Sequence, residues 1–134
     1  MSNTGYALTG FVSWALLLLV VMETIRTYLV VTGKVAANAF TPDNSGLSPF
    51  MQRLARAHAN CIEGLPIFGG LLAIAIMTSR TESTDPLAFW FLGARIVQSI
   101  VHLTSTSPIA VSLRFTAFAV QMAIGVYWSW KLMV

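Results

Sequence analysis

Four long apolar stretches, separated by short polar segments, limit the fold of this chain more than any other feature. They cover residues 6–33, 52–78, 86–105 and 109–132. Each is close to or longer than the roughly 20 residues that cross a bilayer as an α-helix. The intervening segments NAFTPDNSGLSPF, SRTESTDP and TSTSP have the proline-rich and polar composition of turns. The sequence therefore predicts an all-α, integral membrane four-helix bundle that forms one domain over residues 1–134.

Composition supports a membrane protein and argues against several other classes. Of the 134 residues, 56% are hydrophobic and 10% are charged, whereas soluble domains have roughly 25% charged residues. The net charge of +3 comes from basic residues that are scattered singly, so no nucleic-acid surface is expected. The single cysteine, Cys61, excludes an intrachain disulfide, and no two histidines are four residues apart. We therefore predict no metal site.

The distribution of basic residues predicts an orientation in the membrane. The end of the bundle with the first and third loops carries more of them than the end with the termini: Lys34, Arg53, Arg56 and Arg114 against Arg80 and Lys131. Because basic residues favour the cytoplasmic side, we expect these two loops in the cytoplasm and both termini in a periplasm or lumen. An interfacial belt of aromatic residues is expected mostly toward the termini: Tyr6, Trp14, Trp90, Tyr127, Trp128 and Trp130.

The second apolar stretch opens on an unusually polar sequence, RLARAHANCIEGLPIFGG, at residues 53–70. At about 100° per residue, Arg53, Arg56, Asn60 and Glu63 fall within a sector of roughly 80°, and His58 points nearly opposite. Polar groups are costly in hydrocarbon, so this stripe must face water, another helix or a ligand.

The third stretch carries a similar stripe of Arg95, Gln98 and His102, at spacings of three and four residues. We expect this stripe to point into the bundle, because lipid would penalise it. Pairing of Glu23 with Arg26, three residues apart on the first helix, would neutralise both.

A surplus of arginine then remains, because Arg56, Arg95 and Arg114 outnumber Glu63. Such a surplus in a helix cleft favours an anionic ligand, such as a peptide-like or phosphorylated small molecule. The alternative is structural: Glu63 would bridge Arg56 or Arg95, and Asn60 would bond a neighbouring helix.

These residues resemble the MAPEG family, the membrane-associated proteins of eicosanoid and glutathione metabolism. The family pattern in the second helix is close to Arg-Ala-His-x-Asn-x-x-Glu-x-x-Pro-Phe. Arg56, Ala57, His58, Asn60 and Glu63 match it in register. The segments VVTGKVAANAF, GARIVQSIVH and SLRFTAF are similar to the end of the family's first helix and to its third and fourth helices.

The resemblance implies a homotrimer that binds glutathione between helices of adjacent subunits, near the cytoplasmic side. Arg56, Asn60 and Glu63 would hold the tripeptide, Arg95 would support them, and Tyr28 would lie at the mouth of the cleft. Arg114 would stabilise the glutathione thiolate. The implied activity is that of a membrane-bound transferase or peroxidase that uses glutathione on a hydrophobic electrophile, with lipid around it and no metal.

Several positions depart from the family pattern and keep a second hypothesis open. Ala59 stands where several members have a second arginine, and Ala36 replaces a basic residue at the end of the first helix. Gln98 and His102 stand where family enzymes often have histidine and tyrosine. The second hypothesis is a non-catalytic protein of the same fold that binds lipid or serves as an accessory subunit of a larger membrane complex. Transport is disfavoured, because the chain shows no inverted repeat and no ring of matched charges.

Overall fold

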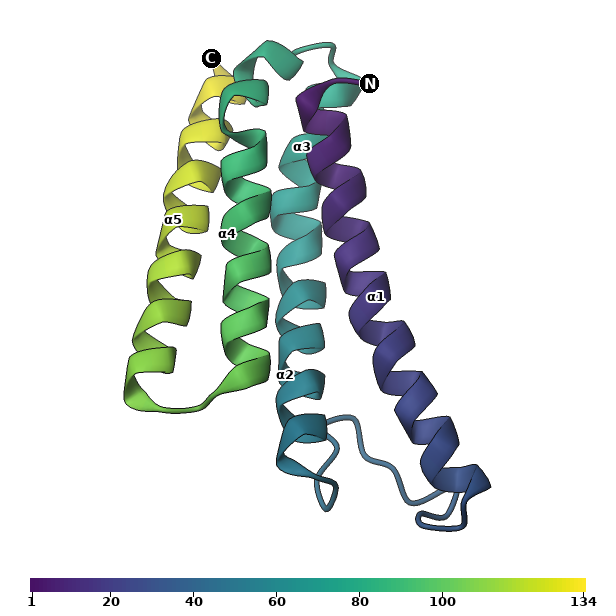
Figure 1. The fold of residues 1–134 in the computed structure, drawn as a ribbon. Coiled ribbons are helices and arrows are strands. Elements are labelled where there is room, and N and C mark those ends of the chain that lie inside the picture. The colour runs from purple at the N-terminus through teal and green to yellow at the C-terminus, as the bar shows by residue number, and fades with distance from the viewer.

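The chain consists of antiparallel helices and the segments that connect them, and no strand is present. The structure, a computed structural model, describes residues 1–134. Figure 1 shows that both termini lie at one end of the bundle, together with the turn before α4. The elements in chain order are α1 (Asn3–Val31), α2 (Pro49–Gly64), the π-helical segment η1 (Leu65–Gly69), α3 (Gly70–Met77), the 3₁₀ turn η2 (Thr81–Ser83), α4 (Asp85–Thr104) and α5 (Pro108–Met133).

The predicted fold class is confirmed. Four helical segments are long and apolar enough to cross a membrane. The second membrane crossing consists of α2, η1 and α3 together. Their ends lie within three residues of the limits predicted from hydropathy. The segments 32–48 and 105–107 lie at the end of the bundle opposite the termini (Figure 1). The assignment of that end to the cytoplasm stays a prediction.

Serine and proline set the starts of three helices. Ser2, Ser48 and Ser107 are N-caps whose hydroxyl oxygens accept hydrogen bonds from backbone N–H groups three residues later. Pro49 and Pro108 follow two of these caps at the first helical position, where a missing N–H costs no hydrogen bond. The first and third polar segments between apolar stretches therefore end in a serine cap and a proline that start the next helix.

Pro66 lies inside the second membrane crossing, within the π-helical segment η1. Proline cannot donate a backbone hydrogen bond, and its ring clashes with the preceding turn. The helix continues past Pro66 with one widened turn and becomes α-helical again at Gly70. The proline is therefore accommodated without breaking the crossing.

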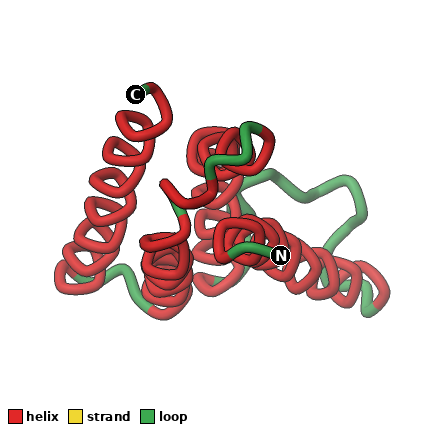
Figure 2. The backbone as a smooth tube through the Cα atoms, turned by 90° about the horizontal axis from the view of Figure 1, so that it is seen from above, coloured by secondary structure: helices red, strands yellow, loops and turns green.

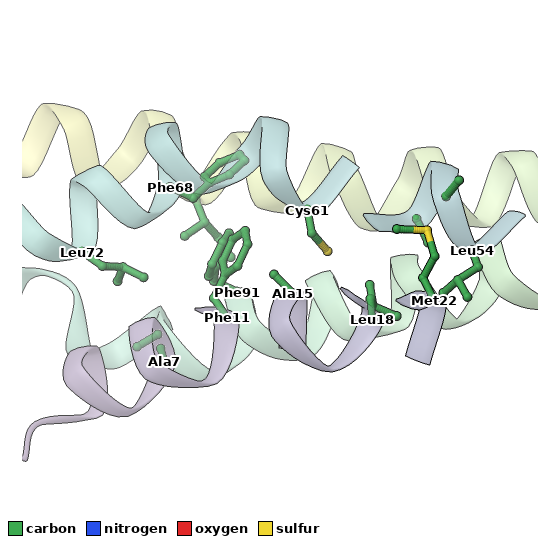
Figure 3. Close-up of a cluster of buried hydrophobic side chains, with 14 of the residues drawn as sticks. Ala7, Phe11, Ala15, Leu18, Met22, Leu54, Cys61, Phe68, Leu72 and Phe91 are labelled. Atoms are coloured by element: carbon green, nitrogen blue, oxygen red, sulfur yellow. The ribbon is translucent and has the colours of Figure 1, made fainter. Parts of the chain in front are cut away.

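Aromatic side chains form the centre of the core. The Phe91 ring lies 5.6 Å from Phe11, 5.1 Å from Phe68 and 5.5 Å from Trp128, measured between ring centroids. Figure 3 shows Phe11, Phe68 and Phe91 meeting between α1, the second crossing and α4, with Ala7 and Ala15 beside them on α1. Trp128 is fully buried, with 0% of its surface exposed. The prediction that Trp128 belongs to an interfacial belt is therefore wrong.

Hydrogen bonds tie the helices together at the end with the termini. The Asp85 carboxylate accepts a hydrogen bond of 2.8 Å from the Thr4 backbone N–H, and the Thr4 and Thr84 hydroxyls are 2.6 Å apart. The Arg80 guanidinium donates to the backbone carbonyls of Lys131 and Leu132, at 2.8 and 2.7 Å. The start of α1 and the end of α5 are thus both fixed to the segment around η2.

The loop between α1 and α2 is held by a buried asparagine. Asn44 adopts a positive φ of 57° and has no exposed surface. Its carbonyl oxygen accepts from Arg26 Nε at 3.0 Å, and its amide donates to the Met51 carbonyl at 2.7 Å. On the exposed side of the loop, hydrogen bonds from the Thr41 hydroxyl and the Ser45 N–H hold the pKa of the Asp43 carboxyl below its usual value.

The helix α5 packs chiefly along α4 and contacts α3 at few points. Viewed from above, α5 stands apart from α1, with α4 between them (Figure 2). This arrangement leaves one side of α5 and the facing side of the second crossing free to line a groove.

Candidate functional site

A groove of about 580 Å³ runs between the second membrane crossing and α5. Its walls are mainly apolar, and polar side chains lie at its two ends. Asn60 and Glu63 mark one end and Ser129 marks the other. The remaining lining residues are Gly64, Ile67, Phe68, Leu71, Phe118, Met122, Gly125 and Val126.

A second cavity of about 270 Å³ adjoins the polar end of the groove. Asn60 and Phe118 line both cavities, and Gln98 and Arg114 line the second one. Asn60 therefore connects the two cavities: Glu63, also from α2, lines the groove, and Arg114, from α5, lines the second cavity. Arg114 is half-buried there, and its Nε atom is buried without a hydrogen-bond partner.

Arg95 lies directly behind the wall of the groove. Only 1% of its surface is exposed, and its guanidinium lies over the rings of Phe11 and Phe118, at 5.3 and 6.0 Å from the ring centroids. Arg95 Nη1 donates to the Asn60 backbone carbonyl at 3.4 Å, while Nε and Nη2 have no partner. A Cβ atom built on Gly64 would lie 2.7 Å from Nη2. Glycine is therefore what lets the guanidinium approach this wall.

The polar stripe of α4 points into the bundle, as predicted. Gln98 and His102 are buried, with 7% and 3% of their surfaces exposed. Gln98 Oε1 accepts from Gln121 Nε2 at 2.8 Å, and His102 Nδ1 lies 3.3 Å from Asn60 Nδ2. Sequence reasoning missed Gln121, whose signal is a lone amide in an otherwise apolar stretch of α5.

The charged residues of α2 have no ion-pair partner within the chain. Glu23 and Arg26 form the one salt bridge, at 3.0 Å, which confirms their predicted pairing. The structural alternative in which Glu63 bridges Arg56 or Arg95 is therefore wrong. The other part of that alternative, a hydrogen bond from Asn60 to a neighbouring helix, is confirmed, because Asn60 contacts His102 of α4. Arg56 and Glu63 are both exposed on a helix long enough to cross a membrane.

Three of the other residues from the sequence lie outside the two cavities. Arg53 is turned toward α4 and donates through Nε to the Leu103 carbonyl at 2.8 Å, near the end of that helix. Tyr28 is exposed on α1, where the Lys34 ammonium lies 5.2 Å from its ring centroid. Cys61 is buried and lies 3.5 Å from the Ser99 hydroxyl. No group of three His, Cys, Asp or Glu side chains lies close enough together to hold a metal ion.

The combined arrangement suits a ligand with both charged and apolar parts. An amide and a carboxylate lie at one end of an apolar groove, a guanidinium lines the adjoining cavity, and the buried Arg95 adds a positive charge behind the wall. A cation in such a partly dehydrated place can stabilise an anion by about 4 kcal/mol at 4 Å, for an effective dielectric constant near 20.

Comparison with known proteins supports the resemblance seen in the second helix. The model of the MAPEG family matches residues 4–134, which is nearly the whole chain. No curated protein and no solved structure matches significantly. The match covers all four membrane-spanning helices and both cavities described above. The chain therefore belongs to the MAPEG family of membrane proteins.

Proposed function

We propose that the protein is a membrane-bound, glutathione-dependent transferase or peroxidase that acts on hydrophobic electrophiles. The observation that carries this proposal is a pair of adjoining cavities that share Asn60, with Glu63 lining the apolar groove and Arg114 lining the second cavity. Membership of a family of glutathione and eicosanoid metabolism supports the choice of glutathione as the thiol.

Each polar residue has a role that matches the chemistry of the tripeptide. Glutathione carries an ammonium group, two carboxylates, two peptide groups and a thiol. In the proposed complex Glu63 accepts from the ammonium group, Asn60 bonds a peptide group and Arg56 pairs with carboxylates. Arg95 supports Asn60 from behind through its contact with the backbone carbonyl.

Arg114 is the proposed catalytic residue. A free thiol has a pKa of about 8.5, so a largely ionised thiol at pH 7 needs a shift of roughly 2 units, or about 2.7 kcal/mol. One guanidinium near the sulfur provides that order of energy. The thiolate then attacks an electrophilic carbon, forms a C–S bond and displaces a leaving group or adds to a double bond. With a hydroperoxide, it attacks the distal oxygen and releases an alcohol, and a second thiol reduces the resulting sulfenic acid to a disulfide and water.

The apolar part of the groove provides a place for the electrophile. Phe68, Leu71, Phe118 and Met122 line it, next to the polar end where the sulfur would lie. A hydrophobic substrate that partitions into the bilayer gains binding energy from burial against such side chains.

We also propose that the working form is a homotrimer. Arg56 and Glu63 are exposed and unpaired on a membrane-spanning helix, where lipid contact would be costly. Contact with a neighbouring copy would cover this face and would place Tyr28 of that copy near the groove. In this arrangement the glutathione sites lie toward the end with segments 32–48 and 105–107, which we predict to be cytoplasmic.

The test is glutathione binding and turnover by the protein purified in detergent. We expect binding at millimolar glutathione and an ultraviolet difference absorbance from the thiolate. Arg114→Ala should lower the conjugation or peroxidase rate about 100-fold, equivalent to 2.7 kcal/mol, and change glutathione affinity by less than about threefold. Lys131→Ala, which removes a cation near the other end of the molecule, is the matched control. A protein that binds no glutathione at this concentration would refute the proposal.

A second candidate is a non-catalytic protein that holds a lipid or serves as an accessory subunit. The apolar groove favours it, because an acyl chain would fit between Phe68 and Met122 without any thiol. Ala36 and Ala59 point the same way, since they remove cations. Mass spectrometry of the purified protein should then find a stoichiometric lipid, or another membrane protein should copurify with it in equal amount. A homotrimer that shows thiolate absorbance with glutathione would exclude this candidate.

A further inference from the structure

Two residues of α4 hold Asn60 in place from different sides. Arg95 Nη1 donates to its backbone carbonyl at 3.4 Å, and His102 Nδ1 lies 3.3 Å from its side-chain nitrogen, Nδ2. Arg95 and His102 are seven residues apart, which places them on the same face of α4, two turns from one another. Both are almost fully buried.

The contact between Asn60 and His102 restricts where protons lie. An amide nitrogen can only donate, so His102 Nδ1 must offer its lone pair. The ring is then neutral and carries its proton on Nε2. No carboxylate forms an ion pair with the ring that would favour its protonation. An imidazolium would also place a donor against the amide nitrogen.

This contact also fixes the direction of the Asn60 carbonyl oxygen. Its amide nitrogen is engaged by His102, while Oδ1 makes no hydrogen bond within the chain. Asn60 lines both the groove and the adjoining cavity. The free oxygen is therefore available where the two cavities meet, and a ligand must present a hydrogen-bond donor to it.

We propose that His102 is a positioning residue that locks the Asn60 amide, so that the site presents an acceptor at Oδ1 and selects an N–H donor of a peptide-like ligand. The proposal rests on the function proposed above and makes it more specific. Asn60 Oδ1 accepts a hydrogen bond from a peptide N–H or an ammonium group of the ligand, and Asn60 does not bind the ligand's carboxylates. Without His102 the amide rotates freely and can present either of its ends.

The first test reads the protonation of the ring directly and needs no ligand. The chain has two histidines, so a His58→Gln variant labelled with ¹⁵N at histidine leaves the His102 nitrogens as the only imidazole signals. At neutral pH we expect a neutral ring with a bare Nδ1 and a protonated Nε2. A proton on Nδ1 would overturn the proposal, because Asn60 would then have to face His102 with its oxygen.

The second test measures the coupling between the two residues through glutathione affinity in detergent. His102→Phe keeps a ring but removes the acceptor, and we expect about a tenfold loss of affinity, the scale of one hydrogen bond. In His102→Gln, a carbonyl oxygen can again accept from Asn60, so the loss should be at most about threefold. In an Asn60→Ala background, His102→Phe should have almost no further effect.

The possible results separate this proposal from the preceding one. An equal loss for His102→Phe with and without Asn60 would mean that His102 acts independently, and would refute the positioning role. Equal affinities for His102→Phe and the unaltered protein would also refute it. If the unaltered protein binds no glutathione, the proposed function fails and the peptide donor fails with it. The ¹⁵N shifts still decide whether His102 locks the amide.

Discussion

Replacing Gly64 with alanine tests how tightly the wall of the groove fits against Arg95. The added Cβ would lie 2.7 Å from Arg95 Nη2, 3.4 Å from its Cζ and 3.5 Å from Phe68 Cδ2. The Arg95 guanidinium has little room to retreat, because it lies over the rings of Phe11 and Phe118 and is 1% exposed. The substitution should therefore displace Arg95 or bend α2.

Two opposing effects set the size of the change in stability. Alanine is favoured over glycine inside a helix by about 1 kcal/mol. Overpacking a filled site costs about 1 to 3 kcal/mol. A matched control is Gly93→Ala in α4, where nothing lies within 4 Å of the added Cβ. Both variants gain the same helix propensity, so Gly64→Ala should be less stable than Gly93→Ala by the whole overpacking cost of about 1 to 3 kcal/mol.

The measurement is thermal unfolding in one detergent, followed by circular dichroism for the unaltered protein and both variants. We expect Gly93→Ala to melt at or above the unaltered protein and Gly64→Ala to melt several degrees below Gly93→Ala. Glutathione affinity should fall in Gly64→Ala alone, because Arg95 moves away from the Asn60 carbonyl. Equal melting temperatures for the two variants would show that Arg95 shifts at no cost, and the account of a rigid wall would be wrong.

Three further predictions concern the core and the first loop. Asn44→Ala removes the hydrogen bonds to Arg26 and to the backbone of α2, so limited proteolysis should cut segment 32–48 faster by about tenfold, and unchanged cleavage would contradict this role. Gln121→Leu leaves the buried Gln98 amide without its partner, so chemical unfolding should show this variant to be less stable than the Gln98→Leu/Gln121→Leu double variant by about 1 to 3 kcal/mol. Gln98→Leu should cost less, because Gln121 Nε2 keeps its hydrogen bond to the Ala117 carbonyl. The hydrogen bonds that lower the pKa of Asp43 stabilise the folded loop above the carboxyl's unfolded pKa, so proteolysis of the loop should accelerate as the pH falls through the folded pKa, and Asp43→Asn should show no such acid step.

The helices and one inward face of this fold could be predicted from the sequence because each has a direct physical signature. Long apolar runs specify membrane crossings by length, and the segments between them carry serine caps and prolines. The burial of Arg95, Gln98 and His102 could be predicted, because the only alternative for these polar side chains is contact with lipid.

The side chains that face the core and the partners of the polar groups could not be predicted, because lipid and core are equally apolar. α5 is hydrophobic on all sides, so its sequence does not reveal that Trp128 faces α4 whereas Trp130 is exposed. Arg53 lies on the same predicted stripe as Asn60, yet its guanidinium is engaged by the Leu103 carbonyl. The partner of a buried polar group depends on which helices are neighbours, and helix spacing within one segment does not contain that information.

The position of Arg95 also has a consequence for ionic strength. The guanidinium acts on the groove through its electric field. Gly64 has no side chain to separate the guanidinium from the groove, and water does not surround the charge. Dissolved salt screens exposed charges strongly and buried ones much less. In a single copy Arg56 is exposed, so its attraction for an anion should fade as salt is added, whereas that of the buried Arg95 should persist. Anion binding should therefore retain a component that salt does not remove, supplied by a residue that the anion never touches.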